Sequence, residues 1–302
     1  MWIPSLVVSY RTALTGLVAL AVIVGVSACS SADSTPPVGS VAVTAARSRV
    51  AIGGPLELTY RFELTGAPIT GDYNVFVHLL NADGQVLWHD DHRPSVPTSA
   101  WKAGTPVEYT RTVFLPPAQL HPGDATVEVG LYRDSERLVL EGPRPPRDQA
   151  ARAYPVVDLQ LAPESENVFL IYQNGWHPDE FGADNPARSW KWTQKSATVA
   201  FRNPKADADV LVEFGARPQA FVDAPQQLSV IGANDELIAA FPVDASEAVQ
   251  QRFRVTAAQM GTGDLAELRF EVDKTFVPAE QGGGQDTRIL GVRIYNVYVD
   301  VR

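Results

Sequence analysis

Three tryptophans lie close together in the second half of the chain, at Trp176, Trp190 and Trp192, with His177 and Glu180 between them. A sugar presents an apolar C–H face and a rim of hydroxyl groups, so a protein that binds it needs an aromatic ring beside fixed polar groups. We therefore predict a glycan-binding site here. Trp176 is its leading residue, because a loop bounded by glycine and proline favours an exposed side chain.

A second interpretation applies to the tryptophan pair. Trp190 and Trp192 are two residues apart, so on a strand they share one face and Lys191 lies on the other. If their face points inward, both rings belong to a hydrophobic core, where large aromatic side chains are common. If it points outward, both rings are available to a ligand. The sequence favours the core but leaves both alternatives open.

Asp286 and Arg288 form the second polar candidate. On a strand, residues two apart point the same way and can pair. An internal ion pair is favoured over ligand contact, because a carboxylate and a guanidinium readily satisfy each other. The glycines at 282–284 do not predict a phosphate loop, because neither a following lysine nor a strand–loop–helix pattern accompanies them.

The segment from His89 to His92 has the sequence His-Asp-Asp-His and invites comparison with a metal site. Imidazole and carboxylate groups do bind zinc. However, residues three apart on a strand face opposite ways, and no further histidine follows nearby to complete a site. We therefore predict no metal, and a solvated strand end.

Catalytic motifs are missing from the sequence. It contains no G-x-S-x-G, H-E-x-x-H or phosphate-loop pattern. A glycosidase needs two acids about 5–10 Å apart. Four candidates exist without a supporting motif: Glu180, Asp273, Glu280 and Asp286. We expect a protein that is not an enzyme and holds no cofactor, with a glycan hydrolase as the less favoured alternative.

The N-terminal segment has the order of a secretory signal, with positively charged Arg11 followed by an apolar run from Thr12 to Val26. Its end, Val26 to Cys29, resembles a bacterial lipobox, which implies cleavage after residue 28 and lipidation of Cys29. Cys29 is the single cysteine, so a disulfide within the chain is excluded. An uncleaved anchor is the alternative, although the run is short for a span of about 20 residues.

The predicted location follows from this leader. Residues 29–39 are small, polar and proline-containing, which predicts a flexible tether. The protein is then a lipid-anchored, extracytoplasmic component of a bacterial cell envelope. The lipobox resemblance, with Ser30 after the cysteine, implies the outer membrane if the organism has two membranes. A formal net charge of −10 argues against nucleic acid as a partner, because nucleic acid is held by clusters of lysine and arginine.

Short alternating runs separated by proline and glycine predict an all-β chain of two β-sandwich domains. Residues 40–162 fit an immunoglobulin-like sandwich. We expect its strands at 56–64, 73–80, 85–88, 107–115, 126–132, 138–140 and 153–161. This part resembles a module appended to bacterial membrane glycosyltransferases and surface proteins, which implies an accessory domain without catalytic residues. The resemblance rests on Asp72–Leu80, Asp83-Gly84, His89-Asp90, Pro97–Trp101 with Gly104, and Val129–Tyr132.

Residues 163–302 fit a jelly-roll sandwich. We expect strands at 168–172, 190–193, 197–202, 210–216, 227–231, 237–243, 251–255, 265–272 and 288–301, and a helical turn at 256–260. The apolar positions of the last strand change parity near Tyr295 and Asn296, which predicts a bulge there or burial of both faces. This half resembles galactose-binding-like carbohydrate-binding modules, on Asn174–Pro178 with Glu180, Ser189–Trp192, Phe276–Pro278 and Asp286–Val292.

The sequence thus predicts a non-catalytic envelope lipoprotein that binds glycan through its C-terminal domain. Its expected contact residues are Trp176, His177, Glu180, Trp190, Trp192, Asp286 and Arg288. The alternative is a structural lipoprotein that scaffolds an envelope glycosyltransferase or export complex through protein contacts.

Overall fold

A computed structural model describes residues 35–66, 68–183, 188–215, 217, 220–221, 224–244, 248–282 and 284–301. The predicted signal peptide (1–28), the predicted lipidation site at Cys29 and residues 30–34 of the predicted tether lie outside the described residues. The described part is built from strands, with four short 3₁₀ turns. None of its helical segments has the length and apolar character needed to cross a membrane. The prediction of an all-β chain of sandwiched sheets is confirmed.

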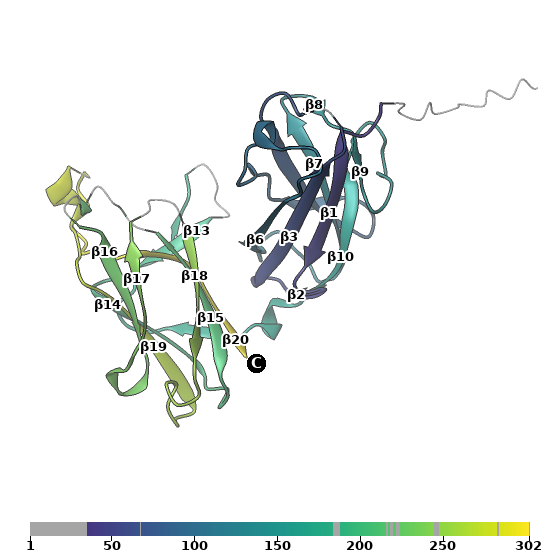
Figure 1. The fold of residues 1–302 in the computed structure, drawn as a ribbon. Helices are drawn as coiled ribbons and strands as arrows, with labels where there is room; N and C mark the ends of the chain where they lie inside the picture. Colours follow the sequence, from purple (N-terminus) through teal and green to yellow (C-terminus); the bar gives the residue numbers. More distant parts are fainter. Residues whose placement is uncertain are drawn as a thin grey trace, which may run out of the picture. The chain divides into compact units, whose positions relative to one another are not determined.

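The strands up to Ala162 form the first sandwich (Figure 1). One sheet has the order β6-β3-β1-β9, and the other has the order β2-β10-β7-β4-β5 with β8 beside β7. The strands are β1 (Gly39–Ala45), β2 (Arg49–Ala51), β3 (Pro55–Leu64), β4 (Asn74–Asn81), β5 (Val86–His89), β6 (Val107–Phe114), β7 (Gly123–Arg133), β8 (Glu136–Arg137), β9 (Leu140–Glu141) and β10 (Tyr154–Ala162). Turn η1 (Thr98–Ala100) precedes β6.

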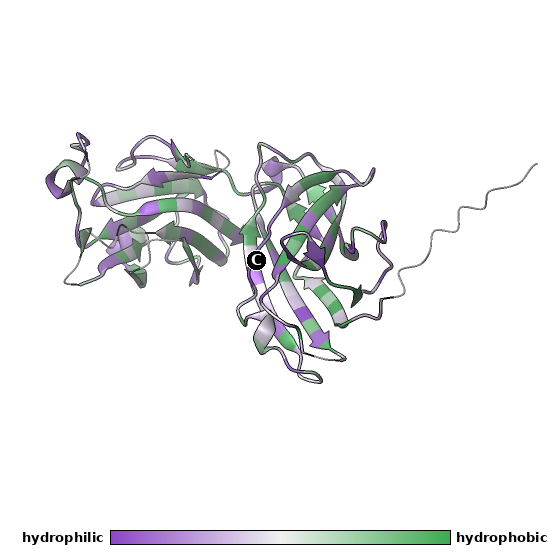
Figure 2. Cartoon of the chain, turned by 90° about the horizontal axis from the view of Figure 1, so that it is seen from above, coloured by the Kyte–Doolittle hydropathy of each residue, from purple (hydrophilic) through white to green (hydrophobic). Residues whose placement is uncertain are grey.

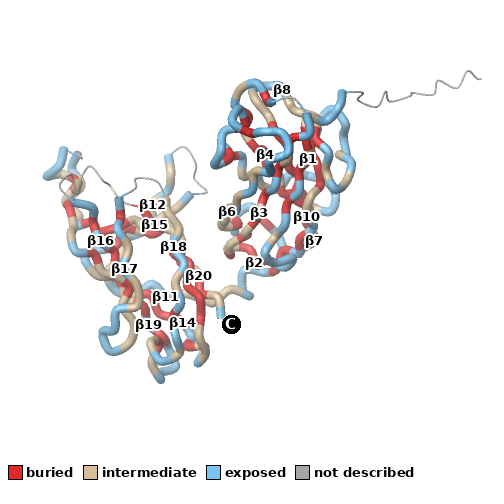
Figure 3. The backbone as a smooth tube through the Cα atoms, viewed as in Figure 1, coloured by how far each residue is buried: buried red, intermediate tan, exposed pale blue. Residues whose placement is uncertain are grey.

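Strand β3 shows why these segments form strands. Its apolar residues recur at every second position, and each of them is buried from Leu56 to Leu64. A strand with this pattern can bury one face and solvate the other. The same alternation of hydrophobic and hydrophilic residues is visible along several strands in Figure 2. Buried residues accordingly lie along the strands, whereas the connecting loops are mostly exposed (Figure 3).

Turn η2 (Glu164–Glu166) leads into the second sandwich, whose sheets have the orders β11-β14-β19-β16-β17 and β12-β13-β20-β15-β18. Its strands are β11 (Leu170–Tyr172), β12 (Glu180–Phe181), β13 (Ser189–Trp192), β14 (Ser196–Arg202), β15 (Ala208–Gly215), β16 (Gln226–Ile231), β17 (Leu237–Val243), β18 (Val249–Val255), β19 (Leu265–Val272) and β20 (Arg293–Val301). Turns η4 (Ala233–Asp235) and η5 (Pro278–Gln281) complete it.

The predicted bulge in the last strand is confirmed. In the pairing of β15 with β20, Glu213 lies opposite Asn296 and Phe214 lies opposite Ile294, so Tyr295 is the extra residue. An inserted residue reverses the direction of every side chain that follows it. Ile294 and Val297 can therefore both enter the core although they are three positions apart.

Several predictions about local structure were wrong. The strand expected at 138–140 is replaced by the short strands β8 and β9, and no range was predicted for the strands β1 and β2. Strand β20 begins at Arg293 and not at Arg288, because the preceding residues bond to separate partners: Leu290 pairs with Phe276, and Gly291 with Thr193. The two-residue strand β12 was not expected, because Glu180 and Phe181 are too few to show an alternating pattern. At 257–260 the chain forms a turn, with the Met260 N–H donating to the Thr256 carbonyl.

Candidate functional site

Glu180 joins the two neighbouring tryptophans in one hydrogen-bonded group. Strand β12 pairs with β13, so that Glu180 lies opposite Trp190. Its Oε2 accepts hydrogen bonds from Trp190 Nε1 at 3.1 Å and from Trp192 Nε1 at 3.2 Å. Both indole N–H groups therefore point at a single carboxylate oxygen, which fixes the orientation of both rings.

The second oxygen of Glu180 connects this group to the other predicted pair. Arg288 Nη2 donates to Glu180 Oε1 at 2.7 Å and to Asp286 Oδ2 at 2.7 Å. Arg288 Nε also donates to Asp286 Oδ1 at 2.9 Å. The predicted Asp286–Arg288 ion pair is confirmed, although the two residues lie in a loop and not on a strand.

The ion pair between Asp286 and Arg288 favours the charged form of both residues. The Arg288 guanidinium, by hydrogen-bonding Asp286, lowers the pKa of that carboxyl to about 2, and the Asp286 carboxylate in turn raises the pKa of Arg288. A general acid that works near neutral pH needs a pKa close to that pH. Asp286 is therefore unsuited to donate a proton to a leaving group.

Strand register places the tryptophans on the outer face of their sheet. Trp192 lies opposite Arg293, and Lys191 lies opposite Ile294. Ile294 is buried in the core between the sheets, so Trp192 and Trp190 point away from that core. They form a separate cluster in which Trp192 is buried with Phe276 and Leu290, while Trp190 is half-buried. Trp190 and Trp192 therefore do not belong to the core between the two sheets, although Trp192 is buried in this smaller cluster.

The leading sequence candidate, Trp176, lies against the core. Its ring makes edge contacts with Tyr172 and Phe270, and its Nε1 donates to the Thr198 carbonyl at 2.8 Å. It is half-buried, so the expectation that its loop exposes it is met only in part. We expect Trp176 to hold the neighbouring loop in place and not to act as the main aromatic contact.

His177 also has a positioning contact. Its backbone N–H donates to the Trp192 carbonyl at 2.9 Å, and its ring Nε2 donates to the Ile289 carbonyl at 2.9 Å. These bonds connect the loop that follows Trp176 both to β13 and to the segment that carries Arg288. His177 thus supports the Glu180 group at its border.

Three polar side chains of the group remain partly open to solvent. The side chains of Glu180, Asp286 and Arg288 are 31%, 28% and 37% exposed. Arg288 Nη1 makes no hydrogen bond with the described residues, so its N–H groups can donate to a ligand. We call Glu180, Trp190, Trp192, Asp286 and Arg288 the Glu180 cluster. It offers an aromatic edge, carboxylate acceptors and a guanidinium donor side by side.

Two residues that the sequence reasoning missed adjoin the Glu180 cluster. The Arg293 guanidinium lies 5.8 Å from the ring centre of Trp190 and 5.7 Å from that of Tyr295. Trp190 and Tyr295 meet edge to face, with their ring centres 5.9 Å apart. The parity change at Tyr295 was the available signal, because a bulge often redirects a side chain at a functional site.

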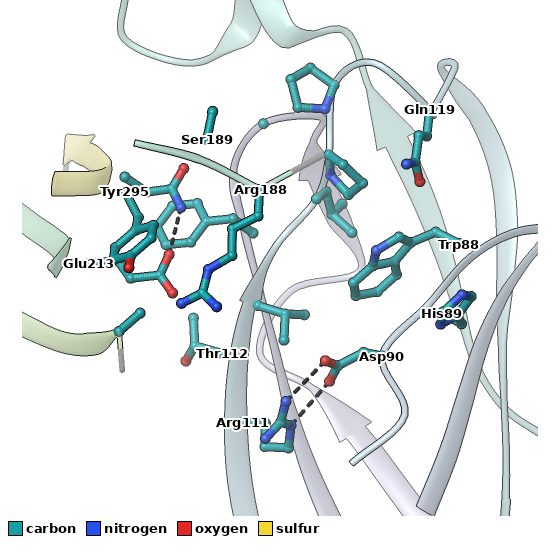
Figure 4. Close-up of a pocket in the computed structure, with 18 of the residues that line it drawn as sticks. Trp88, His89, Asp90, Arg111, Thr112, Gln119, Arg188, Ser189, Glu213 and Tyr295 are labelled. Carbon is teal, nitrogen blue, oxygen red and sulfur yellow. Dashed lines mark hydrogen bonds and ion pairs between the residues drawn. The ribbon is translucent and has the colours of Figure 1, made fainter. Parts of the chain in front are cut away.

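The segment from His89 to His92 is organised around a buried histidine. His92 Nδ1 donates to the Asp90 carbonyl at 2.9 Å, so its Nε2 accepts from the Tyr109 hydroxyl at 2.8 Å. The Asp90 carboxylate accepts two hydrogen bonds from Arg111, one from Nε and one from Nη2, as the dashed lines in Figure 4 show. The prediction of a solvated strand end was wrong for His92, which is 9% exposed.

No group of three or more metal-ligating side chains is found among the residues that the structure describes. Both ring nitrogens of His92 have protein partners, and His89 lies exposed on β5. The absence of a metal nevertheless stays a prediction.

We expect the first sandwich to lose stability as the pH falls below about 6.5. Burial lowers the pKa of His92, and the nearby charges of Arg111, Asp90 and Asp91 act in opposing directions. An unfolded histidine has a pKa of about 6.5. Between that value and the lower folded value, the unfolded chain binds more protons, so stability rises with pH in this window. Urea unfolding midpoints at pH 7.5 and 5.5 measure the effect.

The variant His92→Gln should show a smaller decrease between these two pH values, because glutamine does not titrate. His89→Gln is the matched control, since it removes an exposed histidine from the same segment. Part of the decrease should remain in His92→Gln, because burial also lowers the pKa of His78, and the whole decrease should remain in the control. An equal pH dependence in the wild type and in His92→Gln would contradict the expectation.

Comparison with known proteins gives no family for this chain. No family model and no curated protein matches it. Among solved structures, it is similar to the CBM51-2 and INT domains of Clostridium perfringens ZmpB (12% identity, 61% of this chain, 38% of that chain, TM-score 0.24). It is also similar to a glycoside hydrolase family 43 arabinoxylan arabinofuranohydrolase from Bacillus subtilis (9% identity, 87% of this chain, 54% of that chain, TM-score 0.25).

A third similar structure is the Pseudomonas fluorescens alkylpurine DNA glycosylase AlkC (12% identity, 41% of this chain, 30% of that chain, TM-score 0.27). The chain spans less than two thirds of the length of each of these structures. Their TM-scores are all below 0.5. The functional argument for this chain therefore rests on its own side chains.

Proposed function

We propose that this protein is a non-catalytic cell-envelope lipoprotein that binds glycan through its second sandwich. The observation that carries the proposal is the Glu180 cluster. One carboxylate orients the half-buried ring of Trp190, the buried ring of Trp192 and a partly exposed guanidinium. A sugar ring needs an aromatic surface for its apolar face, and charged hydrogen-bonding groups for its hydroxyls. In the Glu180 cluster these groups are already in place before a ligand arrives.

Preorganisation strengthens this argument. A side chain that is ordered only on binding costs about 0.5–1.5 kcal/mol of affinity. Trp190 and Arg288 are each held by Glu180, so little of this cost arises at these two positions. The lipid on Cys29 would hold the protein at the membrane, and the tether would let the second sandwich reach envelope polysaccharide.

Binding of the purified protein to a broad glycan array tests this function. We expect reproducible binding that Trp190→Ala weakens by at least about 30-fold, as for a central aromatic contact. Trp190→Phe keeps a ring but lacks the N–H donor, and it should retain more binding than the alanine variant. Phe169→Ala is the matched control, because it removes an aromatic side chain that is 80% exposed outside the Glu180 cluster.

Circular dichroism at the assay temperature must confirm that each variant is folded. Loss of binding in folded Trp190→Ala, with Phe169→Ala unchanged, supports the proposal. If the folded wild-type protein binds no glycan on the array, the proposal is overturned. The scaffolding alternative would then be preferred, with partners sought by pull-down.

A further inference from the structure

Cationic and aromatic side chains gather on the outer face of the sheet that carries the Glu180 cluster. Arg188 lies 4.7 Å from the ring centre of Tyr295, and Arg293 lies 5.4 Å from that of Trp192. Each guanidinium is thus placed against an aromatic ring, a contact that orients it without neutralising its charge. In Figure 4 the side chain of Arg188 lies beside the ring of Tyr295, and Glu213 lies nearby on the same sheet.

Among the residues that the structure describes, none forms an ion pair with Arg188. Its side chain is exposed, and no carboxylate among the described residues lies within ion-pair distance of it. Arg288, by contrast, is paired with both Glu180 and Asp286. The carboxylate of Glu213, on the same face, accepts a hydrogen bond from Asn296 Nδ2 at 2.6 Å.

We propose that this face, with Arg188 as the main contact, selects glycans that carry an anionic group. The inference rests on the proposed glycan-binding function and adds the substrate class. A guanidinium presents a planar fork of donors that matches a carboxylate or a phosphate. The ring of Tyr295 beside it suits the apolar face of the sugar that bears this group.

The charge of the whole chain makes the local arrangement significant. The protein has a formal net charge of −10, so its long-range field repels anions. An exposed arginine held on an aromatic ring opposes that field at one place. A neutral glycan would gain little from such a group, because a guanidinium contributes most when its partner is charged.

Two matched pairs of ligands test the inference with the purified full-length protein. The first pair is oligogalacturonate and its fully methyl-esterified form, and the second is phosphomannan and unmodified mannan. Each pair shares a sugar backbone and differs in its anionic group. Isothermal titration calorimetry at low and high salt should give tighter binding of one anionic member by about tenfold or more, and salt should reduce the difference. A preference within the first pair indicates that the protein recognises a carboxylate, and a preference within the second pair indicates a phosphate.

Three variants assign the effect to this face. Arg188→Gln should remove most of the preference for the anionic member, and Arg188→Lys should restore part of it. Glu213→Gln should increase the preference, because it removes a negative charge that repels the anionic ligand. Arg202→Gln is the control, because it removes an exposed arginine from β14 in the opposite sheet, and it should leave the preference unchanged.

The failures of the two proposals can be told apart. Equal binding of charged and neutral members, or a preference that Arg188→Gln does not alter, overturns the inference while glycan binding stands. Binding of no glycan here or on the array overturns both proposals. Because Arg188 lies outside the hydrogen-bonded Glu180 cluster, its variants are expected to remain folded, and their melting temperatures check this.

Discussion

Glu180→Gln is expected to destabilise the second sandwich by about 2–4 kcal/mol, and to lower its melting temperature by about 5–15 °C. The two oxygens of Glu180 accept three hydrogen bonds, from two indole N–H groups and one guanidinium. A glutamine amide has one oxygen and one NH₂ group. Whichever way it turns, its NH₂ faces donors, and at least one donor in a partly buried site loses its partner.

Thermal unfolding followed by circular dichroism measures this change. Asp264→Asn is the matched control, because it also converts an acid to its amide but at an exposed side chain with no hydrogen-bond partner among the described residues. It should change the melting temperature by little. If Glu180→Gln and Asp264→Asn had the same melting temperature, the Glu180 carboxylate would not be holding the two rings. The argument that the binding groups are preorganised would then fail.

Gly175→Ala is expected to destabilise the protein by about 3 kcal/mol or more, since it combines two separate costs. Gly175 has a φ of +85°, where an L side chain is strained, and a Cβ at this position would lie 1.9 Å from the Ser196 carbonyl oxygen. The Gly175 carbonyl also accepts from the Gln194 N–H at 2.7 Å. The backbone therefore cannot move aside without breaking the contact that places Trp176 and His177.

Gly282→Ala separates the two costs. Gly282 has a similar φ of +75°, but no atom lies within 4 Å of the position its Cβ would occupy. It should lose only about 1 kcal/mol, from backbone strain alone. Urea unfolding of the two variants beside the wild type gives both values. Equal losses would show that the close approach of Gly175 to Ser196 contributes nothing.

The strands themselves could be predicted from the sequence in most cases. A strand buried on one face must alternate apolar and polar residues, and this period is readable without knowing its neighbours, as in β3. The change of parity near Tyr295 was readable for the same reason, and the structure places a bulge there. Strand β12 was missed because two residues cannot display a period.

The site was predicted as a set of residue types but not as an arrangement. The Asp286–Arg288 pair could be expected because the two residues are close in sequence. The contact between Glu180 and Arg288 could not, because 108 residues separate them. The pairing of β12 with β13 and the docking of the segment before β20 bring them together, and both depend on long-range contacts.

The sequence by itself determined the all-β class, the positions of most strands, and which side chains share a face of each strand, because these follow from local periodicity. Only the tertiary structure decided which face is covered. Trp190 and Trp192 share a face as their spacing requires. That face points away from the core between the sheets, yet Phe276 and Leu290 cover Trp192 there, whereas Trp176 turns toward the core. Burial depends on what packs against a surface, and that partner comes from distant parts of the chain.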